Sequence, residues 1–124
     1  MTSKKHILVV EDHKPMLGAI ESILKLRGYA VSTAVNGIDA IQMMEETQPD
    51  LLIVDILMPE MDGYAFYREV RKRPEWRSTP FIFLTSMADR EDIQKGKELG
   101  VDSYITKPFD PEELMGAVRA GLED

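Results

Sequence analysis

Short apolar runs alternate with amphipathic stretches along this chain, which is the pattern expected of alternating strands and helices. The runs lie at residues 7–10, 29–34, 51–55, 81–85 and 103–105. The first and third contain the uninterrupted segments ILVV and LLIV, as is typical of strands buried on both faces of a parallel sheet. We therefore predict five strands at these positions.

Between the first two runs, apolar residues recur at helical spacing. The predicted inner stripe of this first helix is Leu17, Ile20 and Leu24. Pro15 suits its first turn, and Gly28 suits the cap at its C-terminal end.

A second helix is expected to begin after Asn36, whose side chain is a good N-terminal cap. Its predicted inner stripe is Ile38, Ile41 and Met44, and it should end before Pro49.

The sequence signals for the third and fourth helices differ in strength. The third is expected over residues 64–72, with Phe66 and Val70 facing inward, and a loop containing two prolines follows at 73–80. The fourth, over residues 89–99, is weak because it has few apolar residues and an internal glycine.

The last helix has a clear start. Asp110 is placed as its cap, Pro111 as its first residue and Glu113 as the partner in a capping box. Its predicted inner stripe is Leu114, Ala117, Val118 and Gly121.

Five alternations of strand and helix predict a doubly wound α/β fold, with helices on both faces of a five-stranded parallel sheet. Right-handed crossovers leave few topologies, and the flavodoxin-like strand order 2-1-3-4-5 is a common one. In that order the carboxyl ends of strands one, three, four and five share the edge where such sheets bind ligands. This edge would carry Glu11, Asp12, Asp55, Thr85 and Lys107.

Composition narrows the class of protein. With 124 residues, 44% of them hydrophobic and 30% charged, the sequence predicts a single globular domain over residues 1–124. Fifteen basic and 22 acidic side chains give a net charge of −7, which disfavours nonspecific binding to nucleic acid or anionic membranes. Cysteine is absent, and the first apolar run is too short for a signal peptide or a membrane span. We expect a cytoplasmic protein.

The predicted sheet edge has unbalanced charge. Three carboxylates, from Glu11, Asp12 and Asp55, carry −3, and Lys107 returns only +1, so either a cation joins them or a pKa rises. Hard oxygen ligands favour Mg2+, which would bring the net charge of the site to zero. Mg2+ often includes phosphate oxygens in its coordination sphere. The Thr85 hydroxyl and the Lys107 ammonium suit a phosphoryl group. Asp55 is then the candidate acceptor of that group.

Other interpretations compete with this one. Taken alone, Asp55 is better explained as a turn or helix cap, and Glu11 and Asp12 could cap the first helix. A flavodoxin-type cofactor binder shares the topology, but it would need a hydroxyl- and glycine-rich loop where this chain has EDHKP. A phosphohydrolase of the haloacid dehalogenase type usually has a second aspartate two residues after the nucleophile, where this chain has Leu57.

Four segments together resemble the receiver domain of two-component response regulators, a family that includes chemotaxis regulators. They are ILVVEDHKPML, PDLLIVDILMPEMDGYAF, PFIFLTSMAD and DSYITKPFDPEEL, in the order and spacing of that family, and they cover essentially the whole chain. Any one of them is a weak signal, whereas the set is highly specific.

The resemblance implies roles for the acidic residues. Asp55 would be the phosphorylated aspartate, Asp12 would bind Mg2+ directly, and Glu11 would hold it through water. The backbone carbonyl of Leu57 would complete the protein ligands. The acidic pair is Glu-Asp here, where Asp-Asp is more usual in the family.

The resemblance also implies roles at the fourth and fifth strands. Thr85 and Lys107 would contact the phosphoryl oxygens, Tyr104 would be the switch aromatic alongside Thr85, and the peptide bond from Lys107 to Pro108 would be cis. Leu57 and Met87 would flank the path of the hydrolytic water.

The implied function is that of a signalling module rather than an enzyme with turnover. A histidine kinase or phosphotransfer protein would supply the phosphoryl group, and the domain would slowly dephosphorylate itself. A downstream protein would read the face formed by the fourth helix, fifth strand and fifth helix. We expect a monomer or weak dimer, either a stand-alone regulator or a receiver domain cut from a longer chain, without direct nucleic-acid or membrane binding.

Overall fold

The strands of this chain form one parallel sheet. The computed structural model describes residues 4–56, 58, 62–86, 94, 97–98 and 103–122. The strands are β1 (His6–Val10), β2 (Ala30–Ala34), β3 (Leu51–Asp55), β4 (Phe81–Ser86) and β5 (Tyr104–Lys107). Their order is β2-β1-β3-β4-β5, and each neighbouring pair is parallel, which confirms the predicted topology.

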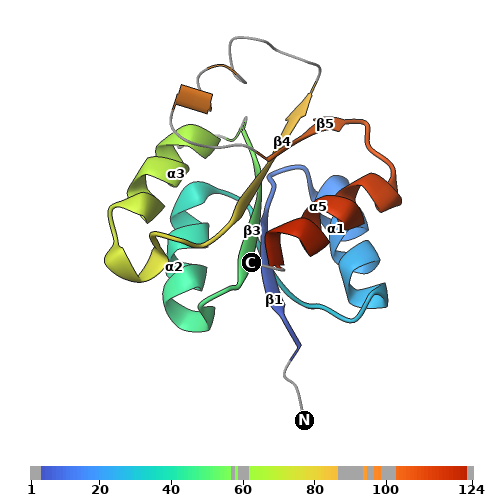
Figure 1. Ribbon diagram of the computed structural model, residues 1–124, viewed down its shortest axis with the longest axis horizontal. Helices are drawn as coiled ribbons and strands as arrows, with labels where there is room; N and C mark the ends of the chain where they lie inside the picture. The colour runs from blue at the N-terminus through green and yellow to red at the C-terminus, as the bar shows by residue number, and fades with distance from the viewer. Residues whose placement is uncertain are drawn as a thin grey trace.

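Helices cover both faces of the sheet (Figure 1). They are α1 (Lys14–Leu26), α2 (Gly37–Thr47), α3 (Gly63–Arg71), the 3-10 helix η1 (Pro74–Trp76) and α5 (Pro111–Leu122). The helices α2 and α3 lie on one face, and α1 and α5 lie on the other. Most of the predicted fourth helix, residues 89–99, lies outside the described residues. No helix in the described part of the chain is both long and apolar enough to cross a bilayer.

The central strands are buried on both sides, as their unbroken apolar runs predict. All five residues of β3 are buried, and so are the last four of β1. Their side chains alternate between two apolar clusters. Leu52 and Val54 join the cluster under α2 and α3, whereas Leu51 and Ile53 join the cluster under α1 and α5. This packing holds the carboxyl ends of β1 and β3 in fixed positions.

Local sequence signals set the helix ends. Gly28 follows α1 with a φ of 94°, a left-handed conformation that glycine adopts without strain. The Asn36 side chain accepts a hydrogen bond from the Asp39 amide at 2.8 Å, and Asp110 accepts one from the Glu113 amide at the same distance. Both predicted caps are therefore confirmed.

The predicted inner stripe of α2 is confirmed at Met44 and wrong at Ile38. Ile38 is 57% exposed, whereas Gly37, Ala40 and Met44 form the buried side of α2, with Ile41 partly buried beside them. Ile38 is one residue from Gly37 and so points about 100° away around the helix. The buried side of α2 thus includes two small residues, Gly37 and Ala40, that the apolar pattern did not single out.

The predicted loop at residues 73–80 contains structure as well. It includes η1, whose Trp76 is buried. The Arg71 guanidinium donates to the Trp76 carbonyl at 2.9 Å and lies over the Tyr67 ring, and Arg73 lies over the Trp76 ring. The guanidinium groups of Arg71 and Arg73 therefore pack on aromatic rings.

Candidate functional site

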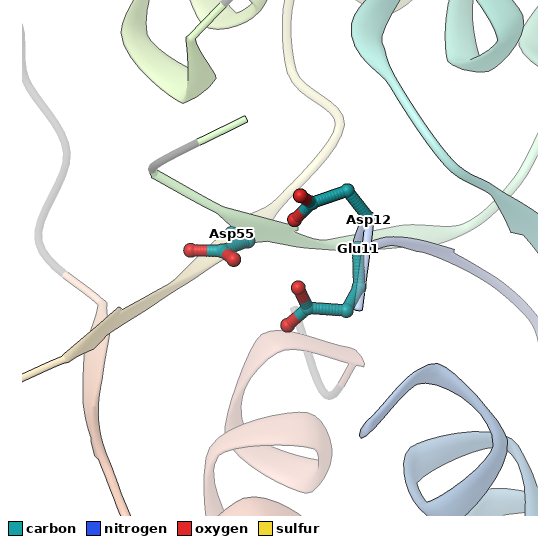
Figure 2. A group of neighbouring side chains, drawn as sticks. All are labelled: Glu11, Asp12 and Asp55. Carbon is teal, nitrogen blue, oxygen red and sulfur yellow. The ribbon is translucent and has the colours of Figure 1, made fainter. Parts of the chain in front are cut away.

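The predicted acidic residues meet at the edge of the sheet where the strands end. Glu11 and Asp12 follow β1 directly, and Asp55 is the last residue of β3, the neighbouring strand. Figure 2 shows the carboxylates of Glu11 and Asp12 directed toward the region in front of Asp55. One oxygen from each of the three lies within 4.8 Å of the others. The structure thus brings together three of the residues that the sequence singled out.

The three carboxylates differ in exposure. Glu11 is fully buried and Asp55 is 6% exposed, whereas Asp12 is exposed. Buried carboxylates are costly unless hydrogen bonds or a cation balance their charge. The amide of His13 supplies one such bond, donating to Oε2 of Glu11 at 3.2 Å.

Lys107 supplies a positive charge to the site from β5. Its ammonium donates to Oε1 of Glu11 at 2.9 Å and to Oδ2 of Asp55 at 3.2 Å. With all groups ionised, three carboxylates and one ammonium leave a charge of −3 + 1 = −2. The peptide bond between Lys107 and Pro108 is cis, as predicted.

Burial and the neighbouring charges together shift the pKa of Glu11. Burial raises this pKa from 4.5 to about 7, and the neighbouring Asp55 carboxylate adds to the increase, while Lys107 and the His13 amide oppose it. Burial alone would lower the pKa of Lys107, but the hydrogen bond to Glu11 and the charges of Asp55 and Glu11 raise it above its ordinary value. Glu11 thus resists ionisation in a cluster that still lacks positive charge.

A divalent cation with a preference for oxygen ligands fits this cluster. Glu11, Asp12 and Asp55 offer carboxylate oxygens only, and the described cluster includes no histidine or thiolate ligand. Such a ligand set favours Mg2+ over zinc or copper. The exposed Asp12 leaves the cation a side open to water. Leu57, whose carbonyl was the fourth predicted ligand, lies outside the described residues, as does Met87.

Thr85 lies on β4, the strand next to that of Asp55, and Tyr104 lies on β5, one strand further along the sheet. Thr85 is buried on β4, and β4 pairs with β3 so that Asp55 is opposite Leu84. Tyr104 on β5 is partly buried and stacks on Phe83 with ring centres 6.1 Å apart. Its hydroxyl lies 3.4 Å from that of Tyr64 on α3.

Gly63 is a residue of the site that the sequence analysis missed. Its amide donates to the carbonyl of Ile56 at 2.7 Å. A Cβ at this position would lie 2.8 Å from Cα of Ile56 and 2.9 Å from the carbonyl oxygen of Asp55. The Asp62-Gly63 pair in the sequence could have pointed to this position. Asp62 caps α3 by accepting a hydrogen bond from the Ala65 amide, so Gly63 is the first residue of the helix. Gly63 thus allows α3 to begin directly against the backbone of Asp55.

Residues 7–119 match the sequence model of the response regulator receiver domain. The chain belongs to this family. Receiver domains are signalling modules of two-component systems that bind Mg2+ in an acidic active site and interact with histidine kinases and downstream effectors.

Individual relatives agree with this assignment. The chain is 40% identical over 114 residues to protein PilG of Pseudomonas aeruginosa, covering 92% of this chain and 84% of PilG. It is 38% identical over 122 residues to ycf27 of Guillardia theta, described as a probable transcriptional regulator, covering 98% of this chain but only 47% of that protein. A solved structure, the receiver domain of sensor histidine kinase PA1611 from Pseudomonas aeruginosa with magnesium in its active site cleft, has a TM-score of 0.90 and 31% identity, and the match covers 98% of this chain and all of the other.

Proposed function

We propose that this receiver accepts a phosphoryl group on the side chain of Asp55, within a single domain over residues 1–124. The observation that carries the proposal is the position of this carboxylate. Asp55 is nearly buried at the end of a central strand, within 4.8 Å of two further acids and 3.2 Å from the ammonium of Lys107. A cap or a surface carboxylate has no need of this arrangement.

The phosphoryl donor would be a phosphohistidine on a histidine kinase or phosphotransfer protein. An oxygen of Asp55 attacks the phosphorus, and the bond from phosphorus to the imidazole nitrogen breaks with its electron pair left on the imidazole. Lys107 and the hydroxyl of Thr85 contact the phosphoryl oxygens as charge shifts onto them. Lys107 already lies between Glu11 and Asp55, so it needs only a small movement to do this.

Asp12, Glu11 and Asp55 would hold Mg2+, together with the carbonyl of Leu57. When bound, Mg2+ neutralises the carboxylates and polarises a phosphoryl oxygen. The fit rests on the all-oxygen ligand set and on the net negative charge that three carboxylates and one ammonium leave at the site. The magnesium in the PA1611 receiver structure supports the same choice of metal.

Phosphorylation would then be read through β5 and its neighbours. Thr85 would move toward the phosphoryl group, and Tyr104, which packs on Phe83, would follow it. A downstream protein would bind the face formed by the fourth helix, β5 and α5. Slow attack of water on phosphorus, breaking its bond to Asp55, would reset the domain.

Chemical phosphorylation tests the proposal without knowledge of the kinase. Incubation with acetyl phosphate and Mg2+ should add one phosphoryl group to the wild-type protein by intact mass, and none to Asp55→Asn. Asp62→Asn is the matched control, because Asp62 caps α3 and asparagine caps equally well. Labelling of the Asp55→Asn protein at the wild-type rate would overturn the assignment.

A further inference from the structure

Tyr64, in the first turn of α3, is a buried tyrosine that contacts the predicted switch residue Tyr104. It is 2% exposed, and its ring packs on Phe83 of β4 with ring centres 5.2 Å apart. Its hydroxyl lies 3.4 Å from the hydroxyl of Tyr104. Tyr104 stacks on the same Phe83 with ring centres 6.1 Å apart. The two tyrosines therefore pack on one phenylalanine and bring their hydroxyl groups together.

The register of the sheet explains why these hydroxyl groups meet. Val54, Phe83 and Tyr104 lie opposite one another on β3, β4 and β5. All three pack in or against the apolar cluster under α2 and α3, which also contains Tyr64. The side chain of Tyr104 is thus on the face of the sheet that α3 covers, where the hydroxyl of Tyr64 can reach it.

The hydroxyl of Tyr64 is not needed to fill the apolar cluster, because the ring of a phenylalanine would occupy the same space. Burying a hydroxyl is unfavourable unless hydrogen bonds replace those that it made to water. In the part of the chain that the structure describes, no buried side-chain oxygen or nitrogen lacks a partner. The 3.4 Å contact with Tyr104 is long for a hydrogen bond between hydroxyl groups, so it can break when Tyr104 moves.

The start of α3 is also attached to the phosphorylation site. The amide of Gly63 donates to the carbonyl of Ile56 at 2.7 Å, and Gly63 lies against the backbone of Asp55 and Ile56 too closely to accept a Cβ. Tyr64 follows Gly63 directly, so its position is fixed relative to the backbone of Asp55. It therefore gives the hydroxyl of Tyr104 a fixed partner on α3, in addition to the strand pairing of β5 with β4.

We propose that Tyr64 is a positioning residue for the switch, whose hydroxyl stabilises the position of Tyr104 against Phe83. This inference rests on the proposed function, in which a phosphoryl group on Asp55 draws Thr85, and with it Tyr104, toward the site. A contact that holds Tyr104 inward then favours the same state as the phosphoryl group does. By linkage, loss of the hydroxyl weakens binding of a phosphoryl group at Asp55, although Tyr64 lies outside the acidic cluster.

Titration with beryllofluoride at fixed Mg2+, followed by the amide signals in NMR spectra, tests this proposal. Beryllofluoride binds an aspartate as a noncovalent mimic of the phosphoryl group, so the experiment measures an equilibrium, to which linkage applies. Tyr64→Phe keeps the ring and removes the hydroxyl, and it should weaken binding by about two- to fivefold, as expected for loss of one modest hydrogen bond.

A double-mutant cycle assigns this effect to the contact between the two hydroxyl groups. Tyr104→Phe should weaken beryllofluoride binding at least as much as Tyr64→Phe does. Adding Tyr64→Phe to Tyr104→Phe should have no further effect, because the shared contact is already lost. Tyr29→Phe is the control: it removes a hydroxyl from a partly buried ring in the cluster under α1 and α5, on the other face of the sheet. Binding should be unchanged in this variant.

A second measurement examines the position of Tyr104 without any phosphoryl group. In protein labelled with fluorotyrosine, the fluorine NMR signal of Tyr104, assigned with Tyr104→Phe, changes between H2O and D2O according to the exposure of the ring. Tyr64→Phe should increase this change, and Tyr29→Phe should not.

The outcomes separate this inference from the proposed function. If the wild-type protein fails to bind beryllofluoride at Asp55, the proposed function is wrong, and the role of Tyr64 is overturned with it. If the wild-type protein binds and Tyr64→Phe binds equally well, only the role of Tyr64 is overturned. The same conclusion follows if the effects of Tyr64→Phe and Tyr104→Phe multiply in the double variant, or if Tyr104 is no more exposed in Tyr64→Phe.

Discussion

The ammonium of Lys107 lies 3.2 Å from Oδ2 of Asp55, although the two residues are 52 positions apart in sequence. The contact spans β4, which separates the strands that carry them. Because Lys107 also donates to Glu11 at 2.9 Å, one side chain balances two buried carboxylates. Lys107 thus has a structural role before any phosphoryl group arrives.

Replacement of Lys107 should expose this role. Lys107→Met keeps most of the side-chain volume but leaves Glu11 and Asp55 facing each other without their cation. We expect a loss of about 1–3 kcal/mol in the free energy of unfolding at neutral pH, because a buried charge loses its partner. Urea unfolding in metal-free buffer measures it, and added Mg2+ should restore part of the loss.

Lys72→Met is the control for this experiment. Lys72 forms a 3.0 Å ion pair with Glu69, but both side chains are largely exposed. Removing it should change the free energy of unfolding by less than about 0.5 kcal/mol. Equal effects of the two substitutions would mean that the contacts of Lys107 stabilise the fold no more than an exposed ion pair does.

Gly63 should not tolerate a side chain. Gly63→Ala places a Cβ against backbone atoms of Asp55 and Ile56, which cannot rotate away, so either α3 or the end of β3 must shift. We expect a loss of about 1–3 kcal/mol in stability, typical of overpacking, together with slower phosphorylation of Asp55. Thermal unfolding and the rate of labelling by acetyl phosphate measure the two effects.

Gly116→Ala should have the opposite effect on stability. A Cβ at Gly116 would meet no atom within 4 Å, and the residue lies inside α5. Alanine there should stabilise the protein by about 0.5–1 kcal/mol through helix propensity and leave labelling unchanged. A gain in stability from Gly63→Ala as well would refute the close approach at Asp55.

The stability of the metal-free protein should depend on pH through Glu11. Its pKa rises from 4.5 in the unfolded chain to about 7 in the folded one, so the folded state holds more protons between these values. The contribution of Glu11 to stability therefore falls as pH rises from about 4.5 to about 7. Asp55→Asn removes one cause of the shift and should flatten this part of the curve, as measured by urea unfolding across pH. An identical slope in the variant would show that Asp55 does not act on Glu11.

Asp12 and Glu11 should differ in their effect on metal affinity. Asp12 is exposed and free to contact Mg2+ directly, whereas Glu11 is buried and bonded to Lys107. Asp12→Ala should therefore weaken Mg2+ binding by a larger factor than Glu11→Ala, whose contact would run through water. Titration of each variant with Mg2+ measures this, and the reverse ranking would show that the two roles are exchanged.

The sequence was sufficient to predict the sheet and the position of its acidic edge. Apolar runs such as ILVV and LLIV are typical of strands buried on both faces of a parallel sheet, and the residues that end neighbouring parallel strands meet at one edge. On α2 the prediction failed at Ile38, which is exposed, and it overlooked the buried Gly37 and Ala40. Close helix packing depends on small residues, which hydrophobic periodicity undervalues.

Other features depend on contacts that no local pattern encodes. The stacking of Arg73 on Trp76 lies in the irregular segment after α3, where hydrophobic spacing predicts nothing. The approach of Gly63 to Asp55 depends on how α3 packs against β3. The roles of Thr85 and Tyr104 in switching come from family resemblance, and they stay predictions.

Chemical mapping of the phosphorylated residue tests the central claim most directly. Borohydride reduces an aspartyl phosphate to homoserine, so the acceptor is identified by its changed mass in a peptide map. After treatment with acetyl phosphate and Mg2+, homoserine should appear at position 55 and at no other aspartate, and its yield should fall when Mg2+ is chelated. Homoserine at Asp12 or Asp62 in place of Asp55, or no homoserine in a protein that has gained a phosphoryl group, would contradict the account.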